Sequence, residues 1–507
     1  MPQQVSTIHP VALAVLEKSL ADSIRPDGTI VATLASPISK SFDSGTLLSW
    51  VASGYFLANA ATQPLSGRLS DIFGRRAGVI FANSFFAIGT LICGLAPTGG
   101  WIIAGRLVAG AGGGCINTLS TFIASDLIPL RKRGLWQGYA NLVYGAGMGT
   151  GGVLGGFIND RLGWRWAFYI QVPFIVLALV VNMFTIRIPI KDNDTSKIKR
   201  VDFAGAVTLC AALVLLLLGL NSGGNTVPWR HPLIYTTLPL SAAFLLAFVV
   251  IEDRFASEPI IPVRLLLHRT VACACLTNWF VTMSVFAVFY YAPIYFQAIQ
   301  GYSATQVGAR LIPTSVGAAV GSMGSGLAMR ATGRYYWLNA VAQGSIVAAC
   351  ALIAALFHRG LPAWPPFLIL LLHGSGYGAM LTVTLLALLS AVGHEHQAVI
   401  TSASYAFRST GSTIGITIAS AVFQNILKTG LWARFGDYPG AEDIIQRIRN
   451  DVDEVNKLGP KWRNAVVGVY EDALDGVWVV VLVLAVMGML VSLGMREHVL
   501  HKKLDRK

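Results

Sequence analysis

The chain carries the sequence GRLSDIFGRR from Gly67 to Arg76, between two apolar runs at residues 46–66 and 77–97. Each run is long enough to cross a hydrocarbon core of roughly 30 Å as a helix. The segment between them is short and basic, and its glycines allow a tight turn and a close approach of helices. We therefore expect two membrane-spanning helices joined by a basic turn.

The composition of the whole chain indicates the same class of protein. Of its 507 residues, 54% are hydrophobic and 12% are charged, and the mean hydropathy is +0.60. An ordinary soluble domain carries about 25% charged residues. These values exclude a soluble enzyme, a disordered chain and a disulfide scaffold, and they predict an all-α polytopic membrane protein.

Apolar runs long enough to span a membrane recur along the chain. Thirteen are clear, at residues 46–66, 77–97, 101–125, 137–158, 166–188, 202–221, 232–252, 270–298, 304–328, 337–357, 365–392, 398–424 and 476–495. A fourteenth would precede Phe42, where only Thr29–Ile38 is freely apolar and charged residues crowd residues 17–27. Each such charge opposes insertion by about 2.5–3.5 kcal/mol. We therefore expect a truncated first helix or a misassigned first exon.

The placement of basic residues predicts the orientation of the chain. The net charge is +13, and the basic residues gather in alternate links between spans. The short links on the other side hold only Lys40, Arg161, Arg165, Arg230 and Arg359. The positive-inside rule puts the basic side in the cytosol, with both termini there if the spans number fourteen. No basic face is interleaved with aromatic residues, so we expect the lipid bilayer as partner and no nucleic acid.

The segment Gly67–Arg76 resembles the signature between helices 2 and 3 of the major facilitator superfamily. The resemblance implies a fold of two six-helix bundles, here with two additional linker helices, and it assigns gating to the motif. Asp71 would make charge-assisted contacts that exist in only one conformation of the transporter. The gating residues carried over are Gly67, Asp71, Gly74, Arg75 and Arg76.

Arg106 stands inside an apolar run, and Gly110, Gly113 and Asn117 share its helix face. A charged residue at membrane depth is costly, so it is a candidate for function. The alternative is that Arg106 extends toward the nearer membrane surface. In the superfamily the matching arginine is tied to proton coupling, which the resemblance assigns to Arg106. We expect Asp27, at the end of the first span, to carry the proton in competition with substrate.

The run Gly145–Gly156 resembles the antiporter motif of helix 5 in drug:proton exporters. Its G-x-G-x-x-G pattern follows no strand, so a dinucleotide site is excluded. The family usually has a proline near position 152 or 153, where this chain has Gly152 and Val153. The antiporter residues carried over are Gly147, Gly151, Gly155 and Gly156.

Two internal echoes predict a repeat. Gly67 and Gly74-Arg75 return as Gly326 and Gly333-Arg334, and the glycines at 110, 112 and 114 return at 374, 376 and 378. Corresponding halves are typical of transporters that work by alternating access. We expect an N-terminal bundle at 1–188, linker helices 7 and 8 at 189–265, a C-terminal bundle at 266–495 with a non-cytosolic loop at 425–475, and a cytosolic tail at 496–507.

That loop contains a helical period formed by Ile444, Ile448, Val452 and Val455. One interpretation is an amphipathic helix that lies on the membrane surface or caps the bundle. The other is a lid that recognises substrate.

Polar side chains within the spans are candidates for the substrate cavity, although such residues also hold helices together. They are Tyr55, Asn59 and Asn117 in the N-terminal half, and Asn278, Tyr290, Gln297 and His373 in the C-terminal half. His373 is the other titratable group that we place at membrane depth, either packed or in a proton relay. The six cysteines lie in apolar runs and indicate buried thiols, without a disulfide framework or metal site.

Further segments resemble narrower branches of the superfamily. Asn159–Phe168 and Asp202–Gly205 resemble the fourteen-helix drug:proton antiporters, and Phe122–Gly134 resembles the fungal vacuolar basic amino acid transporters, although toxin exporters share much of it. The resemblance implies a monomeric proton-coupled exporter of a basic amino acid or an amphipathic drug or toxin, in the vacuolar or plasma membrane. It implies no cofactor. A transporter-like nutrient sensor and a membrane-embedded enzyme are the alternatives; the tail is short for a sensor, and no catalytic cluster indicates an enzyme.

Overall fold

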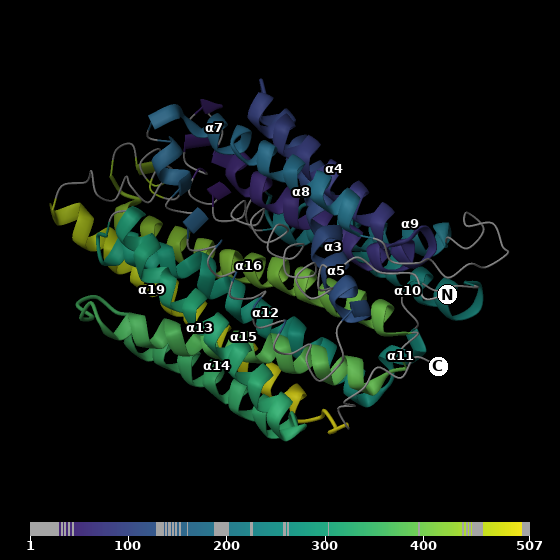
Figure 1. Ribbon diagram of the computed structural model, residues 1–507. Coiled ribbons are helices and arrows are strands. Elements are labelled where there is room, and N and C mark those ends of the chain that lie inside the picture. Colours follow the sequence, from purple (N-terminus) through teal and green to yellow (C-terminus); the bar gives the residue numbers. More distant parts are fainter. Residues whose placement is uncertain are drawn as a thin grey trace, which may run out of the picture.

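The computed structural model describes residues 30–31, 34, 37–38, 41–42, 45–127, 136, 139, 143, 147, 150–151, 154–159, 161–186, 202–223, 227–256, 260, 263–302, 304–393, 396–438, 441–442, 445, 448 and 460–498. Within these residues the secondary structure is helical, apart from one isolated bridge between Gly223 and Val227. The long helices run side by side, with the first half of the chain on one side and the last half on the other (Figure 1).

The N-terminal bundle is described by five helices, and the linker by three. The first set is α3 (Gly45–Phe73), α4 (Arg75–Leu95), α5 (Gly99–Leu127), α7 (Trp164–Tyr169) and α8 (Gln171–Thr185). The linker set is α9 (Phe203–Ser222), α10 (Pro232–Arg254) and α11 (Val263–Leu266).

The C-terminal bundle begins with α12 (Arg269–Ile294), which continues into the π-helical turn η2 (Tyr295–Ile299). The bundle continues with α13 (Ala304–Thr332), α14 (Tyr336–Leu356), α15 (Pro365–Ala391), α16 (Gln397–Phe435) and α19 (Pro460–Ser492).

Ten helical segments among the described residues are long and apolar enough to cross a membrane. Helices α3 and α13 have 29 residues each but are not among these ten candidate spans. The fold is therefore all-helical and multi-pass, as the composition predicts, but the expected fourteen spans are not shown. The run at 137–158 and the region before residue 45 lie largely outside the described residues.

The short apolar segment near the N-terminus packs as part of the first bundle. Ile30, Val31, Leu34 and Ile38 are helical and at most 5% exposed. They share a core with a group from neighbouring helices, namely Val51, Cys93, Ile102, Trp164 and Phe168. Asp27 and the charged residues before it lie outside the described residues.

Glycines bring α5 into backbone contact with two neighbours. A Cβ on Gly110 or Gly114 would meet the carbonyl of Tyr55 or Asn59 on α3, and one on Gly112 would meet Ala82 on α4. Only glycine permits helices to approach this closely. We call this arrangement the N-terminal glycine interlock.

The same arrangement recurs in the second half. A Cβ on Gly374 or Gly378 of α15 would meet the carbonyl of Thr314 or Ala318 on α13, and one on Gly376 would meet Ala342 on α14. The contacted residues Thr314, Ala318 and Ala342 follow Tyr55, Asn59 and Ala82 by 259 or 260 positions, and the glycines follow theirs by 264. The repeat read from the sequence is therefore confirmed as a structural repeat, and we call this second arrangement the C-terminal glycine interlock.

Two helices extend into the segment expected to form the non-cytosolic loop at 425–475. Helix α16 has 39 residues and ends at Phe435, and α19 begins at Pro460. Both helices are longer than the roughly 20 residues that a bilayer requires, so they extend beyond it. The ring of Phe435 stacks on that of Trp462 with centroids 4.4 Å apart, which holds the two extensions together.

Part of the predicted amphipathic helix lies within the described residues. Residues 441, 442, 445 and 448 are helical, and Ala441, Ile445 and Ile448 are buried. The carbonyl of Ile448 accepts a hydrogen bond of 2.7 Å from the hydroxyl of Tyr470 on α19. This face packs on the helix extensions, which favours a cap on the bundle over a helix lying on the membrane.

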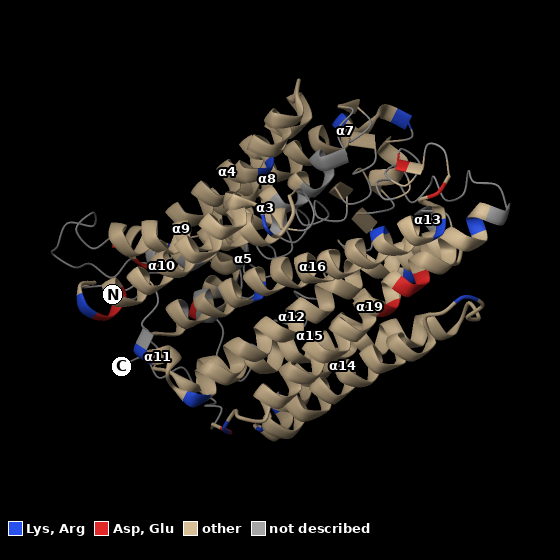
Figure 2. Ribbon diagram, turned by 180° about the vertical axis from the view of Figure 1, so that it is seen from behind, with Lys and Arg blue, Asp and Glu red and all other residues tan. Residues whose placement is uncertain are grey.

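Most of the charged residues coloured in Figure 2 lie near the ends of the helices. Two arginines depart from this pattern. Arg106 on α5 is 2% exposed and Arg408 on α16 is 9% exposed. Each lies inside a long apolar helix, and the two belong to different bundles.

Candidate functional site

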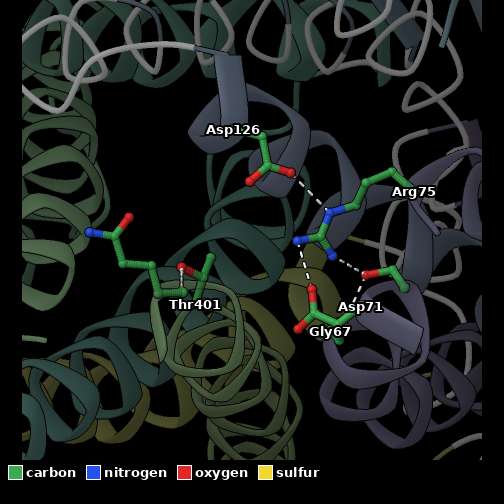
Figure 3. Close-up of polar contacts among 7 residues, drawn as sticks. Gly67, Asp71, Arg75, Asp126 and Thr401 are labelled. Carbon is green, nitrogen blue, oxygen red and sulfur yellow. Dashed lines mark hydrogen bonds and ion pairs between the residues drawn. The ribbon is translucent and has the colours of Figure 1, made fainter. Parts of the chain in front are cut away.

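The link between α3 and α4 builds an ion-pair cluster around Arg75. Gly74 has a φ of 94°, a conformation that favours glycine, and it turns the chain from one helix into the next. Arg75 Nη2 lies 2.8 Å from Asp71 Oδ1, and Arg75 Nε lies 3.1 Å from Asp126 Oδ2 (Figure 3). A further hydrogen bond joins Arg75 Nη1 to Ser70. The cluster therefore ties the ends of α3, α4 and α5 together.

The cluster is partly shielded from solvent. The side chain of Arg75 is 10% exposed, and those of Asp71 and Asp126 are 25% and 29% exposed. The guanidinium lies 5.0 Å from the ring centroid of Phe122. A bridging arginine shared by two carboxylates is worth more than an isolated surface pair, which contributes about 0–1 kcal/mol.

The sequence predicted only part of this cluster. Asp71, Gly74 and Arg75 lie together, and Gly67 is buried in α3, whereas Arg76 is exposed. Asp126 was not expected to take part. The available signal was an acidic residue that directly follows the span at 101–125, on the same membrane side as the motif.

The echo of this link in the second half is built differently. Gly333 has a φ of 71° and occupies the place of Gly74, but Arg334 is exposed. Tyr335 instead donates a hydrogen bond of 2.6 Å to the carbonyl of Arg496. Burial raises the pKa of the Tyr335 hydroxyl, so it stays protonated and can donate. The ion pairs of the N-terminal link involve Arg75, whereas the contact described in the second link runs through Tyr335.

We predict that Asp71→Asn lowers the transport rate about 10-fold while the protein still reaches the membrane. The variant keeps the shape of the side chain and loses one charge-assisted contact to Arg75, worth about 1.5–3 kcal/mol. Initial transport rates, divided by the amount of protein in the membrane, measure the effect. Asp126→Asn should have a similar effect, because it removes the other half of the cluster. Full transport by both variants would remove the cluster from the mechanism.

Arg106 points toward α3 rather than toward solvent. Its Nε donates a hydrogen bond of 3.2 Å to the carbonyl of Val51, and its guanidinium lies 4.4 Å from the ring centroid of Tyr55. These contacts and its burial do not fit an arginine that extends to the membrane surface. The side chain of Asn117, expected on the same face, lies outside the described residues, as does Asp27.

A hydrogen bond joins the two bundles close to these residues. Ser409 Oγ on α16 donates to Asn59 Oδ1 on α3 over 3.3 Å. Tyr290 on α12 lies within electrostatic reach of Arg106 on α5. The predicted cavity residues Tyr55, Asn59 and Tyr290 therefore lie near the surface where the bundles meet.

Asn278 takes part in a second buried cluster that sequence reasoning missed. Its side-chain oxygen accepts a hydrogen bond of 3.0 Å from Nε of Arg408. Arg408 stands ten residues inside the apolar run at 398–424, so the signal that could have found it was the same as for Arg106. His373 was therefore not the only other ionisable candidate at membrane depth.

The remaining predicted residues are placed apart from these clusters. His373 is 0% exposed on α15, and neither ring nitrogen has a hydrogen-bond partner among the described residues, so no proton relay is evident there. Gln297 is half-buried in η2. The four glycines of the antiporter run are helical: Gly147, Gly151, Gly155 and Gly156. Gly151 and Gly155 are buried, and Gly155 packs against Ile30.

Comparison with known proteins gives the family. The model of the Major Facilitator Superfamily matches residues 26–416, which is most of the chain. This chain belongs to the major facilitator superfamily. It is a membrane transporter and not an enzyme, as the motifs predicted.

Two curated relatives from Schizosaccharomyces pombe cover most of the transporter. The multidrug resistance protein fnx1 is 37% identical over 95% of this chain and 91% of its own length. The vacuolar membrane amino acid uptake transporter fnx2 is 31% identical over 89% of this chain and 77% of its own length. The two alignments cover 95% and 89% of this chain, enough to include α5 and α16, which carry the two buried arginines. The two relatives have different substrates in their names, so they do not give the substrate of this transporter.

Among solved structures, the human organic anion transporter MFSD10 resembles this transporter with a TM-score of 0.59. The match covers 96% of this chain and 100% of that one, at 15% sequence identity. Similarity at this level shows the shared fold. The function of this transporter therefore has to be argued from its own residues.

Proposed function

We propose that this transporter exports a small organic substrate from the cytosol in exchange for protons. The observation that carries the proposal is a pair of buried arginines, Arg106 and Arg408, one in each bundle near the Asn59–Ser409 contact. A buried charge is costly and is retained where it serves transport or ion coupling. The structural repeat supports alternating access, in which one bundle rocks against the other.

In this proposal each cluster has a separate role. The Arg75 cluster stabilises one conformation of the gate on the side that the basic links place in the cytosol. Asp27 exchanges its proton for substrate, and Arg106 takes part in the coupling. Because the carboxylate of Asp27 cannot hold a proton and substrate at the same time, the proton and the substrate cross the membrane in opposite directions. Gly147, Gly151, Gly155 and Gly156 let the antiporter run pack closely against its neighbours in both conformations.

The substrate class follows the two S. pombe relatives. The name of fnx1 refers to multidrug resistance and that of fnx2 to vacuolar amino acid uptake. We propose a basic amino acid or an amphipathic drug or toxin as substrate. The vacuolar or plasma membrane is the proposed location, with fourteen spans, cytosolic termini and a monomeric protein.

The test is uptake into inside-out vesicles that contain the transporter. An imposed pH gradient, acidic inside, should drive accumulation of lysine, arginine or histidine if the substrate is an amino acid, and of amphipathic drugs if it is not. Asp27→Asn should abolish the gradient-driven part and leave downhill exchange. Vesicles from cells without the transporter provide the background.

Two outcomes would contradict the proposal. Accumulation that persists when the gradient is collapsed by a proton ionophore would exclude proton coupling. Gradient-driven accumulation by Asp27→Asn at the wild-type level would leave antiport intact but exclude Asp27 as the proton carrier.

A further inference from the structure

Three helices of the C-terminal bundle meet at Arg408. Its Nε donates a hydrogen bond of 3.0 Å to Asn278 Oδ1 on α12, and its Nη2 donates one of 3.3 Å to the carbonyl of Leu381 on α15. The ring centroid of Tyr405, one turn earlier on α16, lies 4.9 Å from the guanidinium. The arginine is therefore held from three sides.

Asn278 is fixed by further hydrogen bonds. Its Nδ2 donates to the carbonyl of Ala274 over 2.9 Å and to Ser404 Oγ over 3.2 Å. Its Oδ1 also accepts a hydrogen bond of 3.1 Å from Thr384 Oγ1 on α15. Asn278, Thr384 and Ser404 are each 0% exposed. A network in which the partners are themselves fixed holds the guanidinium in one orientation.

All of these acceptors are neutral. Within the part of the chain that the structure describes, no carboxylate lies within ion-pair distance of Arg408, and its Nη1 has no hydrogen-bond acceptor. Arg75 differs, because two aspartates neutralise it. A buried charge that has no counter-charge costs several kcal/mol. Nη1 keeps its N–H groups for a ligand, and a carboxylate is an acceptor that an arginine binds strongly.

The cluster lies beside the contact between the two bundles. The next residue, Ser409, makes the hydrogen bond to Asn59 across the two bundles. Arg408 follows the start of α16 by eleven residues, which places it roughly 16 Å along the helix and well inside the membrane. Arg408 is 9% exposed, so the residue is not completely enclosed.

We propose that Arg408 binds the carboxylate of the transported substrate, with Asn278 and Thr384 as positioning residues. The proposal rests on the proposed function and narrows its substrate class to molecules that carry a carboxylate. An amino acid would place its α-carboxylate on Arg408, and its positively charged groups would lie away from the guanidinium.

The first experiment compares transport of lysine and lysinamide, in which a neutral amide replaces the carboxylate. The wild-type protein should prefer lysine, and Arg408→Gln should raise the KM for lysine about 10- to 100-fold while leaving lysinamide unchanged. The KM of Arg408→Lys for lysine should fall between those of the wild-type protein and Arg408→Gln, because lysine keeps the charge but lacks the planar guanidinium. Arg310→Gln is the matched control: Arg310 is half-buried on α13 and lies 3.5 Å from the ring of Tyr302, but it is outside the cluster.

The second experiment does not depend on the identity of the substrate. Phenylglyoxal modifies accessible arginines, and mass spectrometry of the peptide that contains Arg408 measures the rate in the purified protein. Sodium acetate should slow the modification of Arg408 relative to sodium chloride at equal ionic strength, and should leave Arg310 unaffected.

The outcomes separate the two proposals. Equal protection of Arg408 by acetate and chloride would overturn the carboxylate site. The same holds if the protein transports a substrate that has no carboxylate and Arg408→Gln impairs that transport. If vesicles show no gradient-driven transport of any compound but acetate protects Arg408, the proposed function fails and the anion site stands.

Discussion

Replacement of Arg106 by glutamine is expected to lower gradient-driven transport on the order of 100-fold. Glutamine can still reach the carbonyl of Val51, but it brings no charge to the face of Tyr55. Since Arg106 is 2% exposed, no water replaces the lost charge. The initial rate of uptake with and without a pH gradient, at equal protein abundance, measures the effect. Arg106→Lys should restore part of the rate, because it keeps the charge.

Arg165 provides the matched control for Arg106. It also donates to a backbone carbonyl, that of Ala96 at 3.0 Å, and its guanidinium also lies near aromatic rings, 4.3 Å from that of Trp164 and 6.0 Å from that of Phe42. It is only half-buried, next to the start of α7. Arg165→Gln should therefore change the transport rate less than about 3-fold, because interactions of a charge that is partly exposed to solvent contribute little. Equal losses from the two variants would show that Arg106 matters through packing and not through its charge in the transport path.

The second large effect concerns stability. Gly321 on α13 packs so closely on α15 that a Cβ there would overlap the carbonyl of Ser375. We expect Gly321→Ala to destabilise the protein by about 1–3 kcal/mol or more, because two helix backbones must move apart. The measurement is the midpoint of thermal unfolding of the purified protein in detergent, together with its abundance in membranes.

Gly324, three residues later on the same helix, has no atom within 4 Å of the position of a Cβ. Gly324→Ala should therefore be neutral or stabilising by up to about 1 kcal/mol, the usual gain in helix propensity. The two variants make the same chemical change on the same helix and are expected to act in opposite directions. A similar midpoint for both would mean that α13 and α15 are not in backbone contact.

The sequence predicted the parts of the fold that depend on composition and spacing. Apolar length predicted the helices, and the repeated glycines at 110–114 and 374–378 predicted corresponding halves, because only glycine serves at a backbone contact. The ends of α16 and α19 were missed, since their extensions contain polar residues such as Lys428 and Glu471 that resemble a loop. There the tertiary contact of Phe435 with Trp462 outweighs local polarity.

The candidate site was predictable only where a residue type is unusual for its surroundings. Arg106 met that criterion and was found. Arg408 met it as well but was not predicted, because it lies in none of the family motifs named above. Asp126 could not be assigned to Arg75 from spacing, since 51 positions separate them and only the packing of α5 beside α4 brings them together. His373 was conspicuous in the sequence but lies among groups that do not bind it.

The unbroken length of α16 has a mechanical consequence. Ser409, its contact with the opposite bundle, divides the helix unequally: 26 residues follow it up to Phe435 and 12 precede it back to Gln397. At 1.5 Å per residue these are lever arms of about 39 Å and about 18 Å. A rigid rotation of about 10° about Ser409 would displace the far end by about 7 Å and the near end by about 3 Å. A single pivot would thus displace the Phe435 end of α16 about twice as far as the Gln397 end.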